Sequence, residues 1–541
     1  MIKVTDLSFG FPQKDLYNKI CFEIEEKDHA VLIGSNGTGK STLVDLLIDT
    51  EKYLYDGKIE KDPSVRIGYV AQYVQHEGCM SAYDFLNEPF EKLMQESDAV
   101  AAEMADAEDM DEVYGRYQDI LDCIDAVDGY NADTNIRKQL AVAGLTAITD
   151  TPVDKISGGE FKLLSIIRNM LLKPQLLIMD EPDAFLDFEN LIGLMKLINQ
   201  YEGTILVITH NRLLLSQCFN KILHLENMEL MEFPGTFAEY NLSMLETKVD
   251  MQEQHQKDEE WIEIQKKVVE KMRTLATNVD SAAKGRQLHA RVSYLERLQE
   301  RATKNPFIED HDYDFSFPEK PVTEEPAAID SEQTEPVQAG WPEKGSLLID
   351  VKDYSLSFDR EILSDVSFQV KAGDKVAIVG ANGTGKSSIL KDMYNRYVSK
   401  DETAFFTQIY EDEQQLSGGE RNLKQLREIA ASDASILLLD EPTSHLDTYA
   451  QIALESAIDA YEGTVLMVSH DFYTVTNCAD RILLLENNTM REMSGRAFRK
   501  MIYKKYFDSD VFEQEKLRKE REIRVNALLK NGKYKEAREL L

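Results

Sequence analysis

The stretch that decides the fold reads Ile156-Ser-Gly-Gly-Glu160, then Leu176-Leu-Ile-Met-Asp180-Glu-Pro182, then Ile205-Leu-Val-Ile-Thr-His210. The chain contains it a second time, as Leu416-Ser-Gly-Gly-Glu420, Ile436-Leu-Leu-Leu-Asp440-Glu-Pro442 and Val465-Leu-Met-Val-Ser-His470. In both copies 24 positions separate the serine from the glutamate that precedes proline, and 29 separate that glutamate from the histidine. Because this spacing is held across an offset of 260 residues, the chain contains an internal repeat and two domains of one kind.

Each copy is preceded by a glycine-rich loop that matches G-x-x-x-x-G-K-[ST] in full and follows an apolar strand. In such a loop, backbone N–H groups close on phosphate oxygens, the lysine reaches the β- and γ-phosphates and the serine hydroxyl is offered to Mg²⁺. A helix begins directly after the loop, so its N-terminus faces the anion. The predicted nucleotide-binding residues are Gly34, Ser35, Asn36, Gly37, Thr38, Gly39, Lys40, Ser41 and Thr42, and Gly380, Ala381, Asn382, Gly383, Thr384, Gly385, Lys386, Ser387 and Ser388.

Two glutamines stand at the ends of predicted strands. Gln72 follows residues 67–71, and Gln408 follows residues 404–407. A glutamine at a strand end is placed to sense Mg²⁺ or attacking water, and its repetition in both copies favours that role over an ordinary surface glutamine.

The two copies differ most between the glutamine and the Ser-Gly-Gly-Glu run. From the lysine of the loop to the serine there are 117 positions in the first copy and 31 in the second. The first copy carries a long acidic stretch of helical character there, which predicts a helical subdomain at about residues 73–155. The second copy has almost lost it.

Composition limits the kinds of protein that this chain can be. A chain of 541 residues is too long for one core, and no run of 18 apolar residues predicts a membrane span. The five cysteines are far apart without a C-x-x-C pair, which favours reduced thiols in a cytoplasmic protein over metal ligands. The net charge of −36 argues against nucleic-acid binding driven by overall charge, so any RNA contact needs a local basic patch.

Such a basic patch lies between the two copies. Apolar residues step by three or four from Trp261 to Leu275 and again from Leu288 to Leu298, which predicts two amphipathic helices. The polar stretch 276–287 between them allows an antiparallel hairpin. Residues 261–305 hold ten Lys or Arg against five Asp or Glu, so this segment is basic. The basic charge favours an RNA-binding role, and the alternative is a coiled-coil spacer with a solvated basic face.

The order of these motifs resembles that of an ATP-binding cassette, with Ser-Gly-Gly-Glu beside a P-loop as the discriminating element. The resemblance covers roughly residues 1–242 and 347–505 and implies two α/β domains with mostly parallel sheets. Cassettes work as pairs, with ATP held between the P-loop of one and the Ser-Gly-Gly-Glu of the other, and one chain supplies both here. The resemblance therefore implies a monomer whose cassettes pair within the chain, with ATP and Mg²⁺ as cofactors.

The resemblance also implies a role for each motif residue. Asp180 and Asp440 would hold Mg²⁺ together with Ser41, Ser387, Gln72 and Gln408. Glu181 and Glu441 would activate the attacking water, and His210 and His470 would contact the γ-phosphate. Residues of the signature turn would bind the ATP of the opposite cassette: Ser157, Gly158, Gly159, Ser417, Gly418 and Gly419. Phe11 and Phe358 stand where these proteins place an aromatic ring on adenine, although an ordinary core phenylalanine is an alternative.

The first copy departs from the family pattern. The second copy reads Glu441-Pro-Thr-Ser-His-Leu-Asp447, close to E-P-T-[NS]-H-L-D, whereas the first reads Glu181-Pro-Asp-Ala-Phe-Leu-Asp187. The first copy also has His210-Asn211 where the second has His470-Asp471. Because both keep the catalytic carboxylate, we expect two competent but unequal sites, with the fuller motifs favouring the site of Lys386 and Glu441.

Two cassettes joined by a basic helical hairpin resemble the F subfamily of ATP-binding cassette proteins, ABC-F. The run from Ser281 to Leu298 is similar to that subfamily's linker, which enters the ribosomal exit site and touches P-site tRNA or the peptidyl-transferase centre. The resemblance implies a ribosome partner contacted through rRNA and tRNA, with Lys284, Arg286 and Arg291 on RNA phosphates. It leaves open whether the protein protects against an antibiotic, rescues stalled ribosomes or regulates translation.

The expected architecture is therefore two tandem α/β P-loop cassettes joined by an α-helical hairpin. We expect a first cassette at 1–244, a hairpin linker at 245–305, an acidic disordered tether at 306–346, a second cassette at 347–505 and a charged helical tail at 506–541. The expected activity is hydrolysis of ATP to ADP and phosphate, coupled to ribosome binding. An ATPase subunit that energises a separate membrane transporter is the alternative, and a chromosome or repair scaffold would need longer coils.

Overall fold

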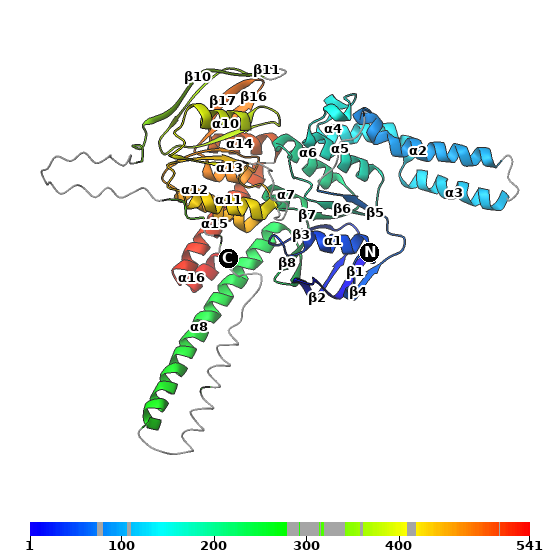
Figure 1. The fold of residues 1–541 in the computed structure, drawn as a ribbon. Helices are drawn as coiled ribbons and strands as arrows, with labels where there is room; N and C mark the ends of the chain where they lie inside the picture. Colours follow the sequence, from blue (N-terminus) through cyan, green and yellow to red (C-terminus); the bar gives the residue numbers. More distant parts are fainter. Residues whose placement is uncertain are drawn as a thin grey trace. The chain divides into compact units, whose positions relative to one another are not determined.

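The computed structural model describes residues 1–72, 79–104, 110–277, 292, 313, 315–318, 341–357, 361–407, 418–507 and 509–541. They form two units: residues 1–234 with 311–506, and residues 235–310 with 507–541. Figure 1 shows the elements of both. We call residues 1–234 the first cassette and residues 341–506 the second cassette. Among the described residues, no helix is both long enough and apolar enough to cross a membrane.

Each cassette is built on a six-stranded sheet of the same order. The first sheet runs β5 (Ile67–Val70), β6 (Leu176–Asp180), β7 (Thr204–Ile208), β3 (His29–Ile33), β8 (Lys221–Glu226), β9 (Glu229–Pro234). The second runs β13 (Thr403–Phe406), β14 (Ile436–Asp440), β15 (Thr464–Val468), β12 (Lys375–Gly380), β16 (Arg481–Glu486), β17 (Thr489–Ser494). All pairs are parallel except the last in each sheet. The predicted α/β fold with two parallel-rich sheets is confirmed.

The parallel register brings the predicted site residues to one edge of each sheet. Asp180 pairs with Ile208, and Asp440 pairs with Val468. In each cassette, the residue that pairs with the aspartate precedes the histidine of the motif by two positions. Because β6, β7, β14 and β15 are buried along their whole length, they are nearly continuous apolar runs, as expected for strands covered on both faces.

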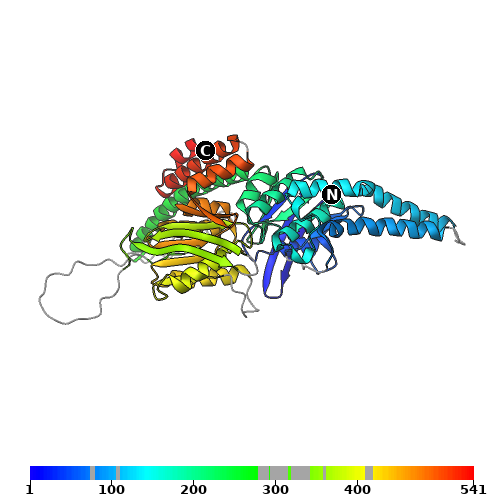
Figure 2. The same ribbon diagram turned by 90° about the horizontal axis from the view of Figure 1, so that it is seen from above.

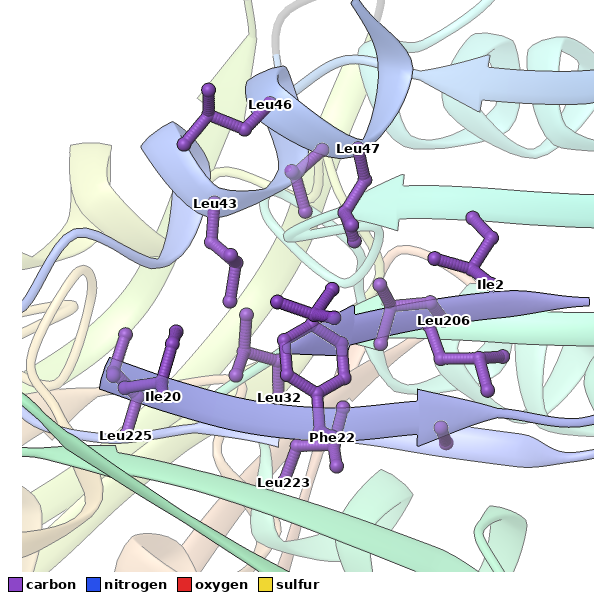
Figure 3. Packing of buried hydrophobic residues seen from close by; sticks show 14 of the residues in the cluster. Ile2, Ile20, Phe22, Leu32, Leu43, Leu46, Leu47, Leu206, Leu223 and Leu225 are labelled. Carbon is purple, nitrogen blue, oxygen red and sulfur yellow. The ribbon is translucent and has the colours of Figure 1, made fainter. Parts of the chain in front are cut away.

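A small antiparallel sheet covers the P-loop helix in each cassette. In the first, β2 (Lys14–Ile24), β1 (Ile2–Phe11) and β4 (Asp56–Lys61) pair in that order; in the second, β10 (Leu347–Ser357) pairs with β11 (Glu361–Lys371). Helix α1 (Lys40–Ile48) buries Leu43, Leu46 and Leu47 in the same core as strands of the antiparallel and the parallel sheet (Figure 3). This packing holds α1 on the sheet and therefore fixes the loop that precedes it.

Helices flank both sheets, and the first cassette has more of them in the described residues. Its helices are α2 (Ala82–Glu103), α3 (Met110–Ala126), α4 (Ala132–Ala143), α5 (Gly158–Leu171), α6 (Phe188–Gln200) and α7 (Arg212–Cys218), with short 3₁₀ turns at Gly129–Asn131, Thr146–Ile148 and Val153–Lys155. In the second cassette they are α10 (Lys386–Arg396), α11 (Gly418–Ala430), α12 (Thr448–Ala460), α13 (Phe472–Cys478) and α14 (Gly495–Tyr506). Helices α2 and α3 run side by side as a hairpin in both views (Figures 1 and 2).

The two cassettes contact each other through a charged cluster and an aromatic one. Arg212 of α7 donates hydrogen bonds to Glu455 of α12 and, at 3.0 Å, to Asp471 at the start of α13. Phe188 at the start of α6 packs on Phe472, with ring centroids 5.9 Å apart. Phe472 is the counterpart of Arg212 in the repeat, so the pair of cassettes is not symmetric at this interface.

The second unit contains both the linker and the C-terminal tail, which the sequence predicted to be separate parts. It contains α8 (Phe237–Thr277), α15 (Ser509–Lys530) and α16 (Tyr534–Leu540). Val249 of α8 is buried together with Val525 and Leu529 of α15 and Ala537 of α16, and Arg538 forms an ion pair with Asp250. The tail thus packs on α8 near its N-terminal end.

Two observations differ from the expectations for the linker and the tether. The predicted apolar face of the first linker helix is wrong at Trp261 and Ile264, which are 47% and 50% exposed, whereas Gln265 and Val269 are buried. In the tether, Tyr313 stacks on Phe315, and Phe317 packs edge-on against Tyr461 of the second cassette. The prediction of disorder is therefore wrong at these aromatic residues, which lose apolar surface by packing on the cassette. The second linker helix lies outside the described residues.

Candidate nucleotide-binding sites

The first P-loop connects β3 to α1 and folds around Lys40. The Lys40 ammonium donates to the carbonyls of Gly34 and Ser35 at 2.9 and 2.8 Å, and burial lowers its pKa to about 8. Gly34 has a φ of 149°, and a Cβ at this position would lie 2.0 Å from the carbonyl oxygen of Leu225. Only glycine fits there, so the loop passes directly over the end of β8.

The second P-loop repeats this geometry between β12 and α10. Lys386 donates to the carbonyls of Gly380 and Ala381 at 2.9 and 2.8 Å, and burial lowers its pKa. Two lysines thus lie at the starts of helices with their cationic groups folded over their own loops. The helix N-terminus and the cation both favour bound anions, and backbone N–H groups line the loop.

Hydroxyl and carboxylate oxygens lie together beside each lysine. Ser387 donates to Asp440 at 2.8 Å, and Ser41 makes the same kind of hydrogen bond to Asp180. Burial raises the pKa of both aspartates. Oxygen donors of this kind suit Mg²⁺, which takes most of its other ligands from phosphates and water. Among the described residues, no group of three or more His, Cys, Asp or Glu side chains is arranged to hold a metal ion.

The two glutamates that precede proline have different partners. Gln72 donates a hydrogen bond to the Glu181 carboxylate, and the imidazole of His445 from the second cassette lies 3.9 Å from it. Burial raises the pKa of Glu181, but the contacts with His445, His210 and Gln72 outweigh burial and leave this pKa below its ordinary value. Glu441 accepts from the backbone N–H of His470 at 3.1 Å, and burial raises its pKa to about 8.

The two histidines at the strand ends are buried and incompletely paired. Burial lowers the pKa of His210 to about 4 and that of His470 to about 3, so both rings are neutral at neutral pH. His210 Nε2 and His470 Nδ1 have no hydrogen-bond partner among the described residues. A buried polar atom without a partner is costly, so these nitrogens fit a role in contacting a polar ligand.

The predicted signature turn of the first cassette caps α5. The Ser157 hydroxyl accepts from the Glu160 N–H at 3.3 Å, and the Glu160 carboxylate accepts from the Ser157 N–H at 3.0 Å, which forms a capping box. In the second cassette, α11 begins at Gly418. Ser417 lies outside the described residues, as do Gln408, Phe358, Lys284, Arg286 and Arg291.

Phe11 lies at the end of β1 and is 44% exposed. Its ring packs edge-on against Phe9 and Tyr53, with ring centroids 5.2 and 6.0 Å away. It is therefore not a core phenylalanine, which was the alternative to an adenine contact.

Each P-loop contacts the turn that follows the Asp-Glu-Pro motif of the opposite cassette. The Asn36 N–H donates to Asp447 at 3.2 Å, and its side-chain amide donates to the His445 carbonyl at 2.8 Å. The Asn382 N–H donates to Asp187 at 2.9 Å, and its side-chain amide donates to the Phe185 carbonyl at 2.9 Å. The signatures lie at the same interface, since a Cβ on Gly419 would lie 2.5 Å from the Asn36 amide and Gly159 lines a cavity together with the second P-loop.

A cavity of about 640 Å³ lies at this interface, on the side of the second P-loop. Its volume is within the range of small-molecule and cofactor sites. The cavity is lined by the second P-loop, by Glu441 and His470, and by the signature glycines of the first cassette, Gly158 and Gly159; residues of the other site, Glu181, His210 and His445, line it as well. The structure therefore brings together residues that the sequence predicted to share one ATP, although they lie in different copies of the repeat.

Two side chains at the site were not predicted to act there. Lys162 of α5 donates to the carbonyls of Ala71 and Gln72 at 2.6 and 2.7 Å, which ties the signature helix to the glutamine, and burial lowers its pKa to about 8. His445 was noted only as part of its own cassette's motif, yet it approaches Glu181 of the other one. In the sequence, the only indication of this contact is that the first copy has Phe185 where the second copy has His445.

Comparison with known proteins gives a consistent family. The model of the family described as ABC transporter matches residues 17–184 and 363–410. The chain is 27% identical to the uncharacterized ABC transporter ATP-binding protein YfmM of Bacillus subtilis, over 87% of this chain and 96% of the relative. It is 26% identical to the energy-dependent translational throttle protein EttA of Haemophilus influenzae, over 84% and 86% of the two chains. It is 23% identical to ABC transporter F family member 5 of Arabidopsis thaliana, over 91% and 76%.

Solved structures share the fold. The structure described as a complex of archaeal ribosomal stalk protein aP1 and ribosome recycling factor aABCE1 aligns with a TM-score of 0.53 at 17% identity, over 93% of this chain and 92% of the other. The structure described as RNase-L Inhibitor aligns with a TM-score of 0.51 at 16% identity, over 93% of both chains. These alignments span both cassettes, so the tandem arrangement is shared as well.

Proposed function

This chain is a twin-cassette protein of the ATP-binding cassette family with ABC-F relatives, and from that premise we propose that it is a cytoplasmic ATPase that binds the ribosome and modulates translation. The observation that carries the ATPase part is the reciprocal contact of each P-loop asparagine with the opposite cassette. Because P-loop and signature meet across this interface, ATP bound there would hold the cassettes together.

Each residue at the interface has a defined part in this proposal. Lys40 and Lys386 neutralise phosphate charge, and the pairs Ser41–Asp180 and Ser387–Asp440 hold Mg²⁺, which offsets charge on the phosphates when bound. Glu181 and Glu441 orient the attacking water and accept its proton. The unpaired nitrogens of His210 and His470 are available to the γ-phosphate.

The ribosomal part of the proposal rests on two observations. Similarity to the translational throttle protein extends over 84% of this chain, so it includes the linker as well as the cassettes. The linker is also basic in a chain whose net charge is −36, and basic side chains on a helix suit phosphate contacts. Cassette closure driven by ATP would set the linker for ribosome binding, and hydrolysis would release it.

The test is to trap the closed state. Glu181→Gln together with Glu441→Gln keeps the phosphate and metal ligands but removes the groups that activate water. We expect this protein to accumulate in the ribosomal fractions of a sucrose gradient with ATP, and to inhibit translation. Adding Lys40→Ala and Lys386→Ala should return it to the top of the gradient, because ATP no longer binds. A trapped protein that never enters the ribosomal fractions would instead favour the alternative, an ATPase subunit of a membrane transporter.

The linker is tested in the same background. Neutralising Lys284, Arg286 and Arg291 should release the trapped protein from the ribosome. It should also make binding less sensitive to salt: the slope of log binding constant against log salt concentration should fall by about one for each phosphate that is no longer neutralised. The matched control is neutralisation of Lys58, Lys92 and Lys352, which carry the same total charge and are exposed on the cassettes. Equal release by both sets would mean that overall charge, not the linker, governs binding.

A further inference from the structure

The turns that follow the two Asp-Glu-Pro motifs have the same backbone. Glu181 and Glu441 have positive φ values of 44° and 52°, and the fourth residue after each, Phe185 and His445, has φ values of 66° and 58°. Such values are uncommon for residues other than glycine and persist only where surrounding contacts enforce them. Both turns are therefore held in one conformation, and what differs between them is the side chains.

The same contacts anchor both turns. Asp187 and Asp447 cap α6 and α12, accepting from backbone N–H groups at 3.0 and 2.9 Å. The second oxygen of each carboxylate accepts from the P-loop of the opposite cassette. The carbonyls of Phe185 and His445 accept from the asparagine of that same loop. Each turn is thus fixed over the P-loop of its partner.

The side chains at the matched positions differ in chemistry, and they meet at the interface: the rings of Phe185 and His445 pack edge-on with centroids 6.0 Å apart, and both line the cavity that also holds Glu181 and Glu441. His445 is 13% exposed, and its Nδ1 lies 3.9 Å from Oε2 of Glu181, which belongs to the other cassette. Phe185 lines the cavity that contains Glu441 and is 49% exposed. A phenyl ring has no donor for a carboxylate, so Glu441 receives no hydrogen bond from this position.

The two glutamates also differ in their partners among the described residues. Glu181 has Gln72 and His445 around its carboxylate. Glu441 accepts from the His470 N–H through Oε2, whereas its buried Oε1 has no hydrogen-bond partner in the part of the chain that the structure describes; His470 Nε2 lies 3.4 Å from it but not in hydrogen-bonding geometry. An unpaired carboxylate oxygen is less firmly oriented toward water.

We propose that His445 is a positioning residue that acts across the cassette interface on Glu181, and that Phe185 withholds the equivalent contact from Glu441. This inference rests on the proposed ATPase activity. In the reaction, the water oxygen bonds to the γ-phosphorus, the bond to the ADP oxygen breaks, and the water proton passes to the Glu181 carboxylate. His445 Nδ1, which lies 3.9 Å from the carboxylate, would donate its N–H to it and fix its orientation once the contact shortens, as catalytic contacts do when substrate binds. The site of Glu181 is therefore the faster one, opposite to the order expected from motif completeness within each cassette.

The test measures phosphate release from proteins with one competent site. With Glu441→Gln, only the site of Glu181 hydrolyses ATP; there His445→Phe should lower kcat roughly ten- to a hundredfold, as expected for misplacement of a catalytic group, with little change in KM. His445→Gln, which retains an N–H donor, should recover part of the loss. With Glu181→Gln, only the site of Glu441 is competent, and there Phe185→His should raise kcat.

A double-mutant cycle distinguishes positioning from damage to the turn. Once Glu181 is glutamine, His445→Phe should add little to the loss, because the group that it positions is gone. Equal losses with and without Glu181, together with no gain from Phe185→His, would overturn the inference. The gain in Phe185→His cannot result from misfolding. If the unmodified protein releases no phosphate, the proposed function itself fails; if it does and the His445 variants match it, only this inference fails.

Discussion

In each P-loop, one lysine side chain gives the loop a buried positive charge that suits an anionic ligand. Lys40 and Lys386 are buried and hydrogen-bonded to carbonyls of their own loops, so these loops themselves hold each cationic group in position. Burial holds the pKa of both below its ordinary value, which means that an anion beside them would be stabilised by an incompletely solvated charge.

We predict that Lys40→Ala and Lys386→Ala each weaken ATP binding at one site and that the double variant loses it at both. Equilibrium titration with ATP and Mg²⁺ measures this directly. Loss of a charge-assisted hydrogen bond costs about 1.5–3 kcal/mol, or roughly ten- to a hundredfold in affinity per site. Lys58→Ala, on the exposed strand β4, is the control for removal of a lysine. Unchanged affinity in the double variant would remove the P-loop assignment.

At the level of residues, the sequence predicted the groups whose partners are close along the chain or fixed by a motif. The P-loop lysines, Asp180, Asp440 and the strand-end histidines lie at sheet edges as the motif order implied. The contact of His445 with Glu181 could not be predicted in the same way. Periodicity and spacing describe one segment, whereas this contact depends on how a turn of one cassette meets a loop of the other.

The helices of the second unit support one another through few apolar contacts. Val249, Val525, Leu529 and Ala537 form its buried cluster. Through this small cluster, the tail covers apolar surface on α8 that would otherwise face water.

We predict that Leu529→Ala destabilises this cluster by about 2 kcal/mol, the lower end of the cost for a buried leucine. Hydrogen exchange should then become faster in α8 around Val249 as well as in α15 and α16, because they share the cluster. Leu517→Ala on the same helix is the matched control, since Leu517 is 63% exposed and Leu529 is 6% exposed. Unchanged exchange around Val249 would show that the tail does not support α8.

At the level of elements, apolar strands and their order were predictable, because a strand buried on both faces is an unbroken apolar run. The contact between the tail and α8 was not, because α15 is charged over most of its length and its apolar residues give a weak helical pattern. The exposed Trp261 has the same origin: apolar spacing identifies a helix but not which side of it is covered.

At the scale of the molecule, each proposed ATP site combines residues from both copies of the repeat. Each cassette supplies a P-loop, a glutamate that we propose to be catalytic, and a signature turn, but the signature lies toward the partner's P-loop. A Cβ on Gly419 of the second signature would lie 2.5 Å from the Asn36 amide of the first P-loop, which shows how closely they meet. Differences in one cassette therefore act on the site of the other, as they do at Phe185 and His445.

The central claim is that each ATP site belongs to both cassettes, and Gly158→Asp tests it most directly. Gly158 lines the cavity of the second P-loop, and a Cβ there meets no atom within 4 Å, so the fold should accept the change. The new carboxylate would oppose the phosphates held by Lys386, in the other cassette. The measurement is ATP hydrolysis in the two single-site proteins. We predict at least a tenfold greater loss with Glu181→Gln, where the site of Lys386 is active, than with Glu441→Gln; a greater loss in the latter would contradict the account.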